Sequence, residues 1–276
     1  MDRIRLIASD MDATLLDEQS QLPADFEETI HALAELGIRF APASGRPLYT
    51  LEELFPTLRD ELVFIGDNGG AIRWKGQNLF TSEMSPEGWR ALNRLTREQG
   101  DIAVLCGLES AYVERPFAVH DAVLRHFYTK IEYVDRLEDV AAPADKFTIY
   151  LPQHNAQQAY DTVYASQRSI YSVAVAGECW VDIMNPGVHK GAALQTLGQL
   201  WGLPRECMMA FGDTYNDAEM LRTAKYGFLM ENGSEPLRQK VPFLAPSHRE
   251  AGVMQVLHRV LAQNGCVCPE DFVPAH

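Results

Sequence analysis

The chain has 276 residues, of which 46% are hydrophobic and 22% are charged, with 19 glycines and 15 prolines. This is the composition of an ordinary globular protein, and it excludes a collagen-like, coiled-coil or disordered chain. The 38 acidic residues outnumber the 24 lysines and arginines, so the formal net charge is −14 at pH 7. Because the cations are scattered singly, we expect neither a nucleic-acid partner nor binding to an anionic membrane. An anionic substrate would need a local cation or a metal.

The sequence also indicates where the protein is found in the cell. No segment approaches the roughly 18 consecutive apolar residues of a membrane helix. The apolar run at residues 6–9 meets Asp10 too early for a signal peptide. Five cysteines, odd in number and widely spaced, argue against a disulfide framework and favour the cytoplasm. Cys266 and Cys268 could pair as thiols, but two ligands are at most half a metal site, so inert thiols are the favoured interpretation.

Both ends of the chain alternate short apolar strands with amphipathic helices, which is typical of parallel βαβ units with helices on both faces of the sheet. Near the N-terminus this pattern predicts strands at 4–9, 38–43 and 62–65 and helices at 23–36 and 47–55. Near the C-terminus it predicts strands at 208–211 and 228–230 and helices at 190–201, 217–224 and about 249–262.

The middle of the chain has a different pattern, in which strand-like segments cluster at 102–106, 111–114, 146–151, 172–176 and 180–184. Helical stretches lie among them near 86–99 and 155–166. This clustering indicates an α+β unit inserted into an α/β domain. We therefore expect an α/β fold with a Rossmann-like parallel sheet as its core domain, made of residues 1–81 and 186–276. The inserted α+β domain would span residues 82–185.

Paired aspartates follow the first predicted strand, in the segment DMDATLL at residues 10–16. If the strand continued, Asp10 and Asp12 would project from the same face, because strand side chains alternate. Two carboxylates that close raise each other's pKa unless a cation lies between them. A divalent metal such as Mg²⁺, which prefers oxygen ligands, would supply that cation. On this motif alone, a pair of turn-capping aspartates is an equally good interpretation.

A second acidic segment, FGDTYND at residues 211–217, follows a predicted strand and opens a helix. It brings Asp213, Asn216 and Asp217 to the carboxyl end of the sheet, where open α/β sheets bind ligands. Spacings of three and four residues place these side chains near one another on a helical turn. Together with the first segment they make a plausible oxygen-rich metal site, whereas the ligand pattern of an EF-hand is missing.

Two shorter motifs could hold an anion. Ser44 and Gly45 end the second predicted strand with a hydroxyl and a glycine amide at a helix start, which makes a modest anion site; a common loop is the alternative. Lys190 begins a helix, where a cation opposes the helix dipole. This placement suggests that its ammonium meets a phosphate or neutralises carboxylates, although a solvated surface lysine remains open.

Taken in order, the four segments resemble the haloacid dehalogenase (HAD) superfamily of phosphotransferases. The long insert between Ser44 and Lys190 resembles the Cof-type branch with a C2B cap. Asn68 and Gly69, after the third strand, look like a pair common in that branch. The resemblance covers the chain up to about residue 262. The sequence departs from the family's pattern at Ala13, where glycine is usual, and at residues 231–233 and 250–253.

This resemblance implies roles for particular residues. Asp10 would be the nucleophile that forms an aspartyl-phosphate, and Asp12 the general acid that protonates the leaving group and then activates water. Mg²⁺ would bind the side chains of Asp10 and Asp213 and the backbone carbonyl of Asp12. Asp217 would lie in or just outside that shell. The phosphate-holding residues would be Ser44, Gly45, Lys190 and Asn216.

The leading hypothesis is a Mg²⁺-dependent phosphatase for a small phosphate ester, either a sugar phosphate or a phosphorylated cofactor. A phosphomutase or another phosphotransferase of the same superfamily remains an alternative, as does a non-catalytic sensor of a phosphorylated metabolite. In the insert, the residues that could face the substrate are Arg115, Arg125, Lys130, Lys146 and Trp180.

Overall fold

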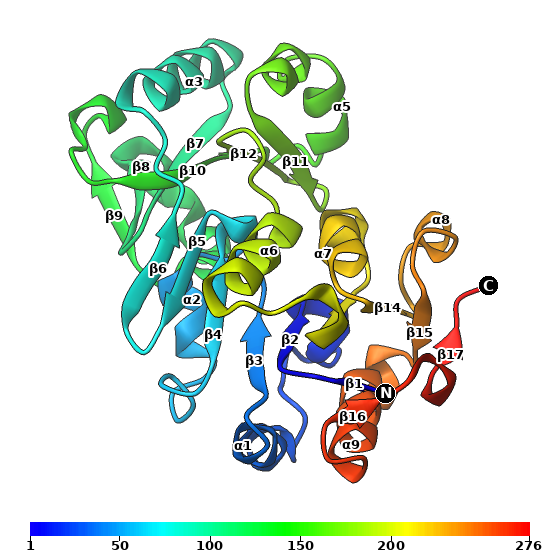
Figure 1. The fold of residues 1–276 in the computed structure, drawn as a ribbon. Helices are drawn as coiled ribbons and strands as arrows, with labels where there is room; N and C mark the ends of the chain where they lie inside the picture. The colour runs from blue at the N-terminus through cyan, green and yellow to red at the C-terminus, as the bar shows by residue number, and fades with distance from the viewer.

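The computed structural model describes all 276 residues. The two ends of the chain build one mostly parallel sheet (Figure 1) with the strand order β17-β15-β14-β13-β2-β3. All neighbours from β15 to β3 are parallel, and β17 is antiparallel to β15. These strands are β2 (Leu6–Ser9), β3 (Arg39–Pro42), β13 (Met208–Gly212), β14 (Tyr226–Met230), β15 (Phe243–Ala245) and β17 (Val273–Pro274). The α/β fold class expected from the sequence is confirmed.

Helices cover both faces of this sheet because each strand buries side chains on both sides. On β2, Ile7 enters one hydrophobic cluster, while Leu6 and Ala8 enter another. The first cluster lies under α1 (Phe26–Glu35) and α9 (Gly252–Ala262), which contribute residues such as Leu33 and Leu257. The second lies under α6 (Lys190–Trp201) and α7 (Ala218–Thr223). The shorter helices of this part are α2 (Leu48–Glu53) and α8 (Glu235–Arg238).

Helix limits follow local backbone chemistry. The helix α6 has the predicted bounds. The last helix begins later than predicted, at Gly252, because residues 248–250 form a 3₁₀ turn and Ala251 is left-handed with φ 52°. The helix predicted at 155–166 ends at Asp161, where α5 (Ala156–Asp161) gives way to irregular backbone and a 3₁₀ turn.

A three-stranded antiparallel sheet, β4-β5-β6, continues the edge of the parallel sheet. Its strands are β4 (Val63–Gly66), β5 (Ala71–Trp74) and β6 (Gln77–Thr81), and β4 joins β3 through a parallel bridge between Ala43 and Ile65. The hairpin of β5 and β6 was not predicted. Its turn residues, Lys75 and Gly76, have φ of 51° and 70°, as a primed two-residue turn requires, but Lys-Gly is not one of the typical turn pairs.

The middle of the chain forms a separate six-stranded sheet in the order β11-β12-β10-β7-β8-β9, antiparallel except between β8 and β9. Its strands are β7 (Ile102–Gly107), β8 (Ala111–Glu114), β9 (Ile131–Val134), β10 (Ala144–Tyr150), β11 (Ser172–Ala176) and β12 (Trp180–Met184). Figure 1 shows α3 (Pro86–Gln99) and α5 beside this sheet, away from the parallel sheet. Strand β9 and helix α4 (Asp121–Phe127) were not predicted.

The register of β10 and β12 decides which side chains of this second sheet face the parallel sheet. Thr148 lies opposite Asp182, and Lys146 lies opposite Met184, so these side chains share one face. That face meets the loops at the carboxyl ends of β3 and β4, since Lys146 donates a hydrogen bond to the carbonyl of Gly45. The other face buries residues such as Phe147 against the helices.

Two short strands pair near the ends of the chain. Strand β1 (Asp2–Arg3) pairs with β16 (Cys266–Val267), which brings the N-terminus beside the segment that follows α9. Among the helices, none combines the length and the apolar character needed to cross a lipid bilayer.

Helix α6 offers a matched test of the packing. Leu194 is fully buried in the second cluster, whereas Leu200 on the same helix is 54% exposed. We expect Leu194→Ala to lower the free energy of unfolding by about 2–5 kcal/mol, because it leaves a cavity in the core. Leu200→Ala should change it by no more than about 0.5 kcal/mol. Denaturant titration of both variants checks this, and equal losses would contradict the packing described.

Candidate active site

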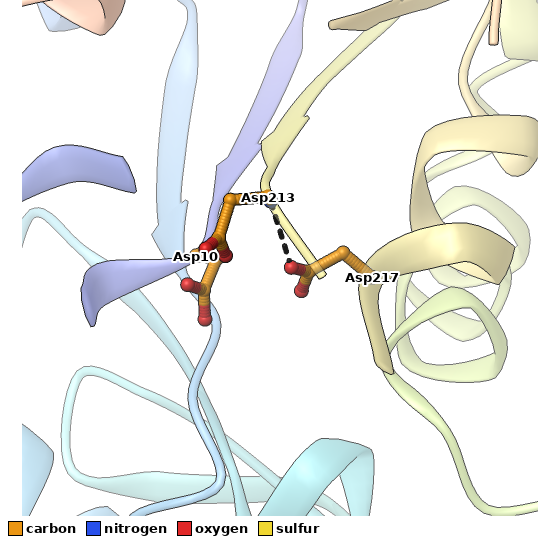
Figure 2. A group of neighbouring side chains, drawn as sticks. All are labelled: Asp10, Asp213 and Asp217. Carbon is orange, nitrogen blue, oxygen red and sulfur yellow. Dashed lines mark hydrogen bonds between the residues drawn. The ribbon is translucent and has the colours of Figure 1, made fainter. Parts of the chain in front are cut away.

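The site lies where adjacent parallel strands end at the same edge of the sheet. Strand β2 ends at Ser9 and its neighbour β13 ends at Gly212, so the next residues, Asp10 and Asp213, lie side by side (Figure 2). Asp217 completes the group, and carboxylate oxygens of the three residues lie within 4.8 Å of one another. All three aspartates are buried.

Asp217 is held in place by the start of the helix that follows β13. Its Oδ2 accepts hydrogen bonds from the backbone amides of Asp213 (3.1 Å) and Thr214 (3.2 Å). Gly212 is required here, because a Cβ at that position would lie 2.4 Å from the Cβ of Asp217. From the sequence we predicted that a spacing of four residues would bring the side chains of Asp213 and Asp217 together. The structure shows that Asp217 also accepts a hydrogen bond from the backbone amide of Asp213.

Lys190 lies beneath the three carboxylates and is fully buried, which excludes the surface-lysine interpretation. Its Nζ donates hydrogen bonds to Asp10 and, at 2.7 Å, to Oδ1 of Asp217. Burial alone would lower the pKa of Lys190, but the charges of Asp10 and Asp217 outweigh it and raise the pKa. The ammonium is therefore charged at neutral pH.

One ammonium does not balance three buried carboxylates. Burial, together with the charge of Asp217, raises the pKa of Asp10 well above its ordinary value. The same two causes raise the pKa of Asp213 to about 6. A divalent cation would offset the remaining negative charge, and an all-oxygen donor set is the one that Mg²⁺ prefers. The residues present therefore fit a Mg²⁺ ion.

Asp12 does not join this cluster. The strand ends before it, and residues 11–15 form an irregular turn, so strand alternation does not relate Asp12 to Asp10 and that part of the prediction is wrong. The side chain of Asp12 is 56% exposed and accepts a 2.7 Å hydrogen bond from Nη2 of Arg46, a residue to which the sequence assigned no role.

Ala13 adopts the left-handed conformation in this turn, with φ 59°. The turn is tied down by Asn232, which donates a hydrogen bond to the carbonyl of Ala13 (2.8 Å) and accepts one from the amide of His248 (3.0 Å). The departures from the family pattern at Ala13 and at residues 231–233 thus meet at one place, beside the catalytic candidates.

Ser44 and Gly45 form the loop after β3. The Ser44 hydroxyl is buried and accepts a hydrogen bond from the amide of Arg46 (3.1 Å), and the Ser44 carbonyl accepts one from the amide of Asn68. A Cβ on Gly45 would lie 3.2 Å from Oδ1 of Asn68. Asn216 reaches the same amide, with its Nδ2 at 3.5 Å from Oδ1 of Asn68.

A cavity of about 1260 Å³ opens between the two sheets above this edge. Of the catalytic, metal-binding and phosphate-holding candidates in the four motifs, those that line it are Asp10, Asp12, Ser44, Gly45, Asp213 and Asn216, whereas Lys190 and Asp217 do not line it. The second sheet adds a polar strip, formed by Lys146, Thr148 and Asp182, beside the aromatic side chains of Phe127 and Trp180.

The candidates in the insert divide into two groups. Lys146 and Trp180 line the cavity. Arg115 and Arg125 instead pair with Asp135 and Asp121 at exposed positions, and Lys130 lies over the ring of Tyr49. Residues that the sequence did not reveal as site candidates are Arg46, Asp67 and Asp182. A signal existed only for their neighbour Asn68, in the Asn-Gly pair after the third strand.

Comparison with known proteins gives a consistent result. The model of the haloacid dehalogenase-like hydrolase family matches residues 7–257. The chain belongs to this family. It is 32% identical over 262 residues to the 5-amino-6-(5-phospho-D-ribitylamino)uracil phosphatase YbjI of Escherichia coli, an alignment that covers 94% of this chain and 96% of the relative. It is 31% identical to the HMP-PP phosphatase of Cronobacter sakazakii, covering 87% and 89%.

Solved structures agree with this assignment of the haloacid dehalogenase-like hydrolase family. A protein from Streptococcus mutans superposes with a TM-score of 0.85 at 29% identity, covering 94% of this chain and 99% of that one. A protein from Eubacterium rectale gives 0.84 at 26% identity, covering 93% and 98%. The resemblance to the HAD superfamily predicted from the four motifs is confirmed, and the enzyme class is phosphoric monoester hydrolase.

The conformation of Ala13 predicts a stabilising substitution. A left-handed backbone conformation costs a residue with a Cβ about 1–2 kcal/mol of folding free energy, and glycine avoids this cost. Part of the gain is lost because glycine makes the unfolded chain more flexible. We expect Ala13→Gly to raise the free energy of unfolding by ~0.5–1 kcal/mol. The matched control Ala32→Gly, within α1, should lower it by ~0.5–1 kcal/mol. Equal destabilisation of both variants in thermal unfolding would contradict the strained turn.

The raised pKa of Asp213 predicts how pH affects the stability of the metal-free protein. The pKa is about 6 in the folded state against 3.8 as the ordinary value, so the folded state binds more protons between these values. Stability should therefore fall as the pH rises through that window. In a chelating buffer, we expect the difference in melting temperature, wild type minus Asp213→Asn, to decrease from pH 4 to pH 7. A constant difference would show that Asp213 titrates normally.

Proposed function

We propose that this hydrolase is a Mg²⁺-dependent phosphatase that transfers the phosphoryl group of a small phosphate ester to Asp10 and then to water. One observation supports this most directly. The carboxylate of Asp10 contacts the Lys190 ammonium and lies in a three-aspartate cluster at the floor of a large cavity. A cytoplasmic location, favoured by the odd number of widely spaced cysteines, is part of the same proposal.

The residues of the chain divide the chemistry among them. Asp10 supplies the attacking carboxylate oxygen, and covalent attack splits the hydrolysis into two easier displacements. Lys190 fixes the orientation of Asp10 and offsets negative charge as the phosphoryl group approaches. Ser44 and the amide of Gly45 hold the phosphoryl oxygens at the adjacent loop, and Asn216 lies across the same cavity.

Asp12 is suited to proton transfer because its carboxylate is exposed to the cavity while Arg46 holds it at 2.7 Å. Protonated Asp12 would give its proton to the leaving alkoxide, and ionised Asp12 would then take a proton from the attacking water. Arg46 holds the Asp12 carboxylate in the same place during both steps. It does not take part in the proton transfer itself, because a guanidinium stays protonated.

A Mg²⁺ ion would be held by Asp10 and Asp213, with the backbone carbonyl of Asp12 as a further oxygen donor and Asp217 in or just outside the shell. When bound, it would neutralise negative charge on the phosphoryl oxygens and align the group with the nucleophile. The charge imbalance among the buried carboxylates supports this assignment.

Residues 82–185 would form a cap domain of the C2B kind on a core of residues 1–81 and 186–276. The second sheet supports this, because all its strands lie between residues 102 and 184 and one of its faces lines the cavity. A cap at this position would exclude water and select the substrate.

For the substrate we propose a phosphorylated cofactor or cofactor precursor with a ring rather than a simple sugar phosphate. The cavity is larger than a phosphate and a sugar require, and its upper wall contains Phe127 and Trp180, whose ring centroids are 5.1 Å apart. The two similar phosphatases are named for a phosphorylated ribitylaminouracil and for HMP-PP.

The nucleophile can be tested with p-nitrophenyl phosphate and Mg²⁺. We expect Asp10→Asn to lower kcat by ~10³-fold or more, since losing a nucleophile removes the covalent route. Chelation of divalent cations should abolish the activity of the wild type. The matched control Asp60→Asn, at an exposed position, should keep wild-type activity.

Each alternative predicts a different result in this assay. Wild-type kcat in Asp10→Asn would contradict the assignment of the nucleophile. A requirement for a bisphosphate activator would indicate a phosphomutase. Phosphate binding without any turnover by the wild type would indicate a sensor.

A further inference from the structure

The turn at residues 67–69, between β4 and β5, contacts every motif that is proposed to hold the phosphate. Asn68 lies against Gly45 and within reach of Asn216. A Cβ on Gly69 would lie 2.6 Å from the carbonyl of His189, the residue that caps the helix of Lys190. A displacement of this turn would therefore move the Ser44–Gly45 loop relative to the rest of the site.

The backbone of this turn is strained. Asp67 and Asn68 have φ of 50° and 54°, so two successive residues with a Cβ are left-handed before Gly69 at 98°. A left-handed residue with a Cβ is unfavourable and persists only where surrounding contacts hold it. The contacts that hold Asp67 and Asn68 therefore decide the geometry of the loop.

Two of those contacts come from the second sheet, which is distant in sequence from this turn. Lys146 on β10 donates a 2.5 Å hydrogen bond to the carbonyl of Gly45, and its Nζ lies 3.0 Å from Oδ1 of Asp67. Asp182 on β12 accepts a 2.9 Å hydrogen bond from Nδ2 of Asn68. Both side chains are almost completely buried.

The Lys146 ammonium is surrounded by protein groups: it donates a hydrogen bond to the Gly45 carbonyl, and its Nζ lies 3.0 Å from Oδ1 of Asp67 and 3.7 Å from Oδ2 of Asp182. Asp182 is likewise engaged, because its Oδ1 accepts a 2.7 Å hydrogen bond from Thr148. Lys146 and Asp182 thus contact the phosphate-holding loop rather than offering free groups to a substrate. Buried ion pairs contribute little net stability, so this arrangement suggests a role in geometry.

We propose that Lys146 and Asp182 are positioning residues that couple the placement of the second sheet to the shape of the phosphate-holding loop. When the sheet lies as seen here, its two strands hold the Gly45 carbonyl and the 67–69 turn, and the loop is ordered for the phosphoryl group. When the sheet moves away, both contacts break together and the loop relaxes. This inference rests on the proposed phosphatase function, because it concerns the efficiency of that reaction.

The test uses p-nitrophenyl phosphate as substrate and inorganic phosphate as competitive inhibitor, because inorganic phosphate has no organic group that the second sheet could recognise. We expect Lys146→Met to lower kcat/KM by about 10- to 100-fold and to weaken inhibition by inorganic phosphate, because small misplacements of reacting groups are costly. The matched control Lys240→Met, at an exposed position, should leave both values unchanged.

A double variant separates positioning from charge balance. Lys146→Met alone leaves the buried carboxylate of Asp67 unpaired, whereas Lys146→Met with Asp67→Asn removes both charges. If Lys146 positions the loop, the double variant regains thermal stability but keeps the lowered kcat/KM. Recovery of wild-type kcat/KM in the double variant would overturn the proposal, because neutralising Asp67 would then be the whole role of Lys146.

Asp182 gives an independent arm that does not depend on how the lysine variants fold. Asp182→Leu removes the acceptor for Asn68 and should weaken both kcat/KM and phosphate inhibition, whereas Asp182→Asn keeps an acceptor and should restore most of both. A lowered melting temperature with wild-type kinetics would show a purely structural role and overturn the proposal. Failure of the proposed function itself is distinguishable, because the wild type would then show no hydrolysis.

Discussion

The interaction on which the site depends is the contact of one buried ammonium, that of Lys190, with the carboxylates of Asp10 and Asp217. Three aspartates within 4.8 Å of one another would repel strongly in a buried environment. Lys190 offsets part of that negative charge. The remaining charge is on carboxylates beside the cavity, which Asp10 and Asp213 line. The same imbalance fits the divalent cation and the anionic substrate that we propose for this site.

The parallel sheet makes this concentration of charge possible. Neighbouring parallel strands end at one edge, so residues about two hundred positions apart in sequence, Asp10 and Asp213, become neighbours without any special loop. The start of each following helix then supplies the remaining groups, with Asp217 on the backbone amides after β13 and Lys190 at the first turn of α6. The helices and their two hydrophobic clusters are the rigid support for this edge.

The second sheet contributes in a different way. Its polar strip approaches the site from the opposite side of the cavity. Its contacts are made to the strained turn at residues 67–69 and to the carbonyl of Gly45 in the loop after β3. Strain of this kind is stored energy that a few contacts can hold or release. This position fits the two proposed roles of the sheet, which are to enclose the substrate and to order the phosphate-holding loop.

Much of this could be predicted from the sequence because the signals are local. Apolar periodicity marked most strands and helices of both sheets, and the bounds of α3, α6, β8, β11 and β12 were predicted correctly, whereas β9, β15 and β17 were not predicted. Short-range spacing likewise identified the residues of the four motifs. The hairpin of β5 and β6, with its Lys-Gly turn, carried no typical turn signal. The Asn-Gly pair at residues 68–69 did signal a turn, but not that Asp67 is left-handed as well.

By itself, the sequence determined the family, the α/β architecture and the identity of the acidic and basic residues at the strand ends. Only the tertiary structure decided how those residues share their charges. It showed that Lys190 is buried against two carboxylates, that Asp12 lies outside the aspartate cluster and accepts a hydrogen bond from Arg46, and that Lys146 donates a hydrogen bond to the carbonyl of Gly45. Periodicity and motif spacing depend on neighbours along the chain, whereas ion pairing, burial and backbone strain depend on residues that only folding brings together.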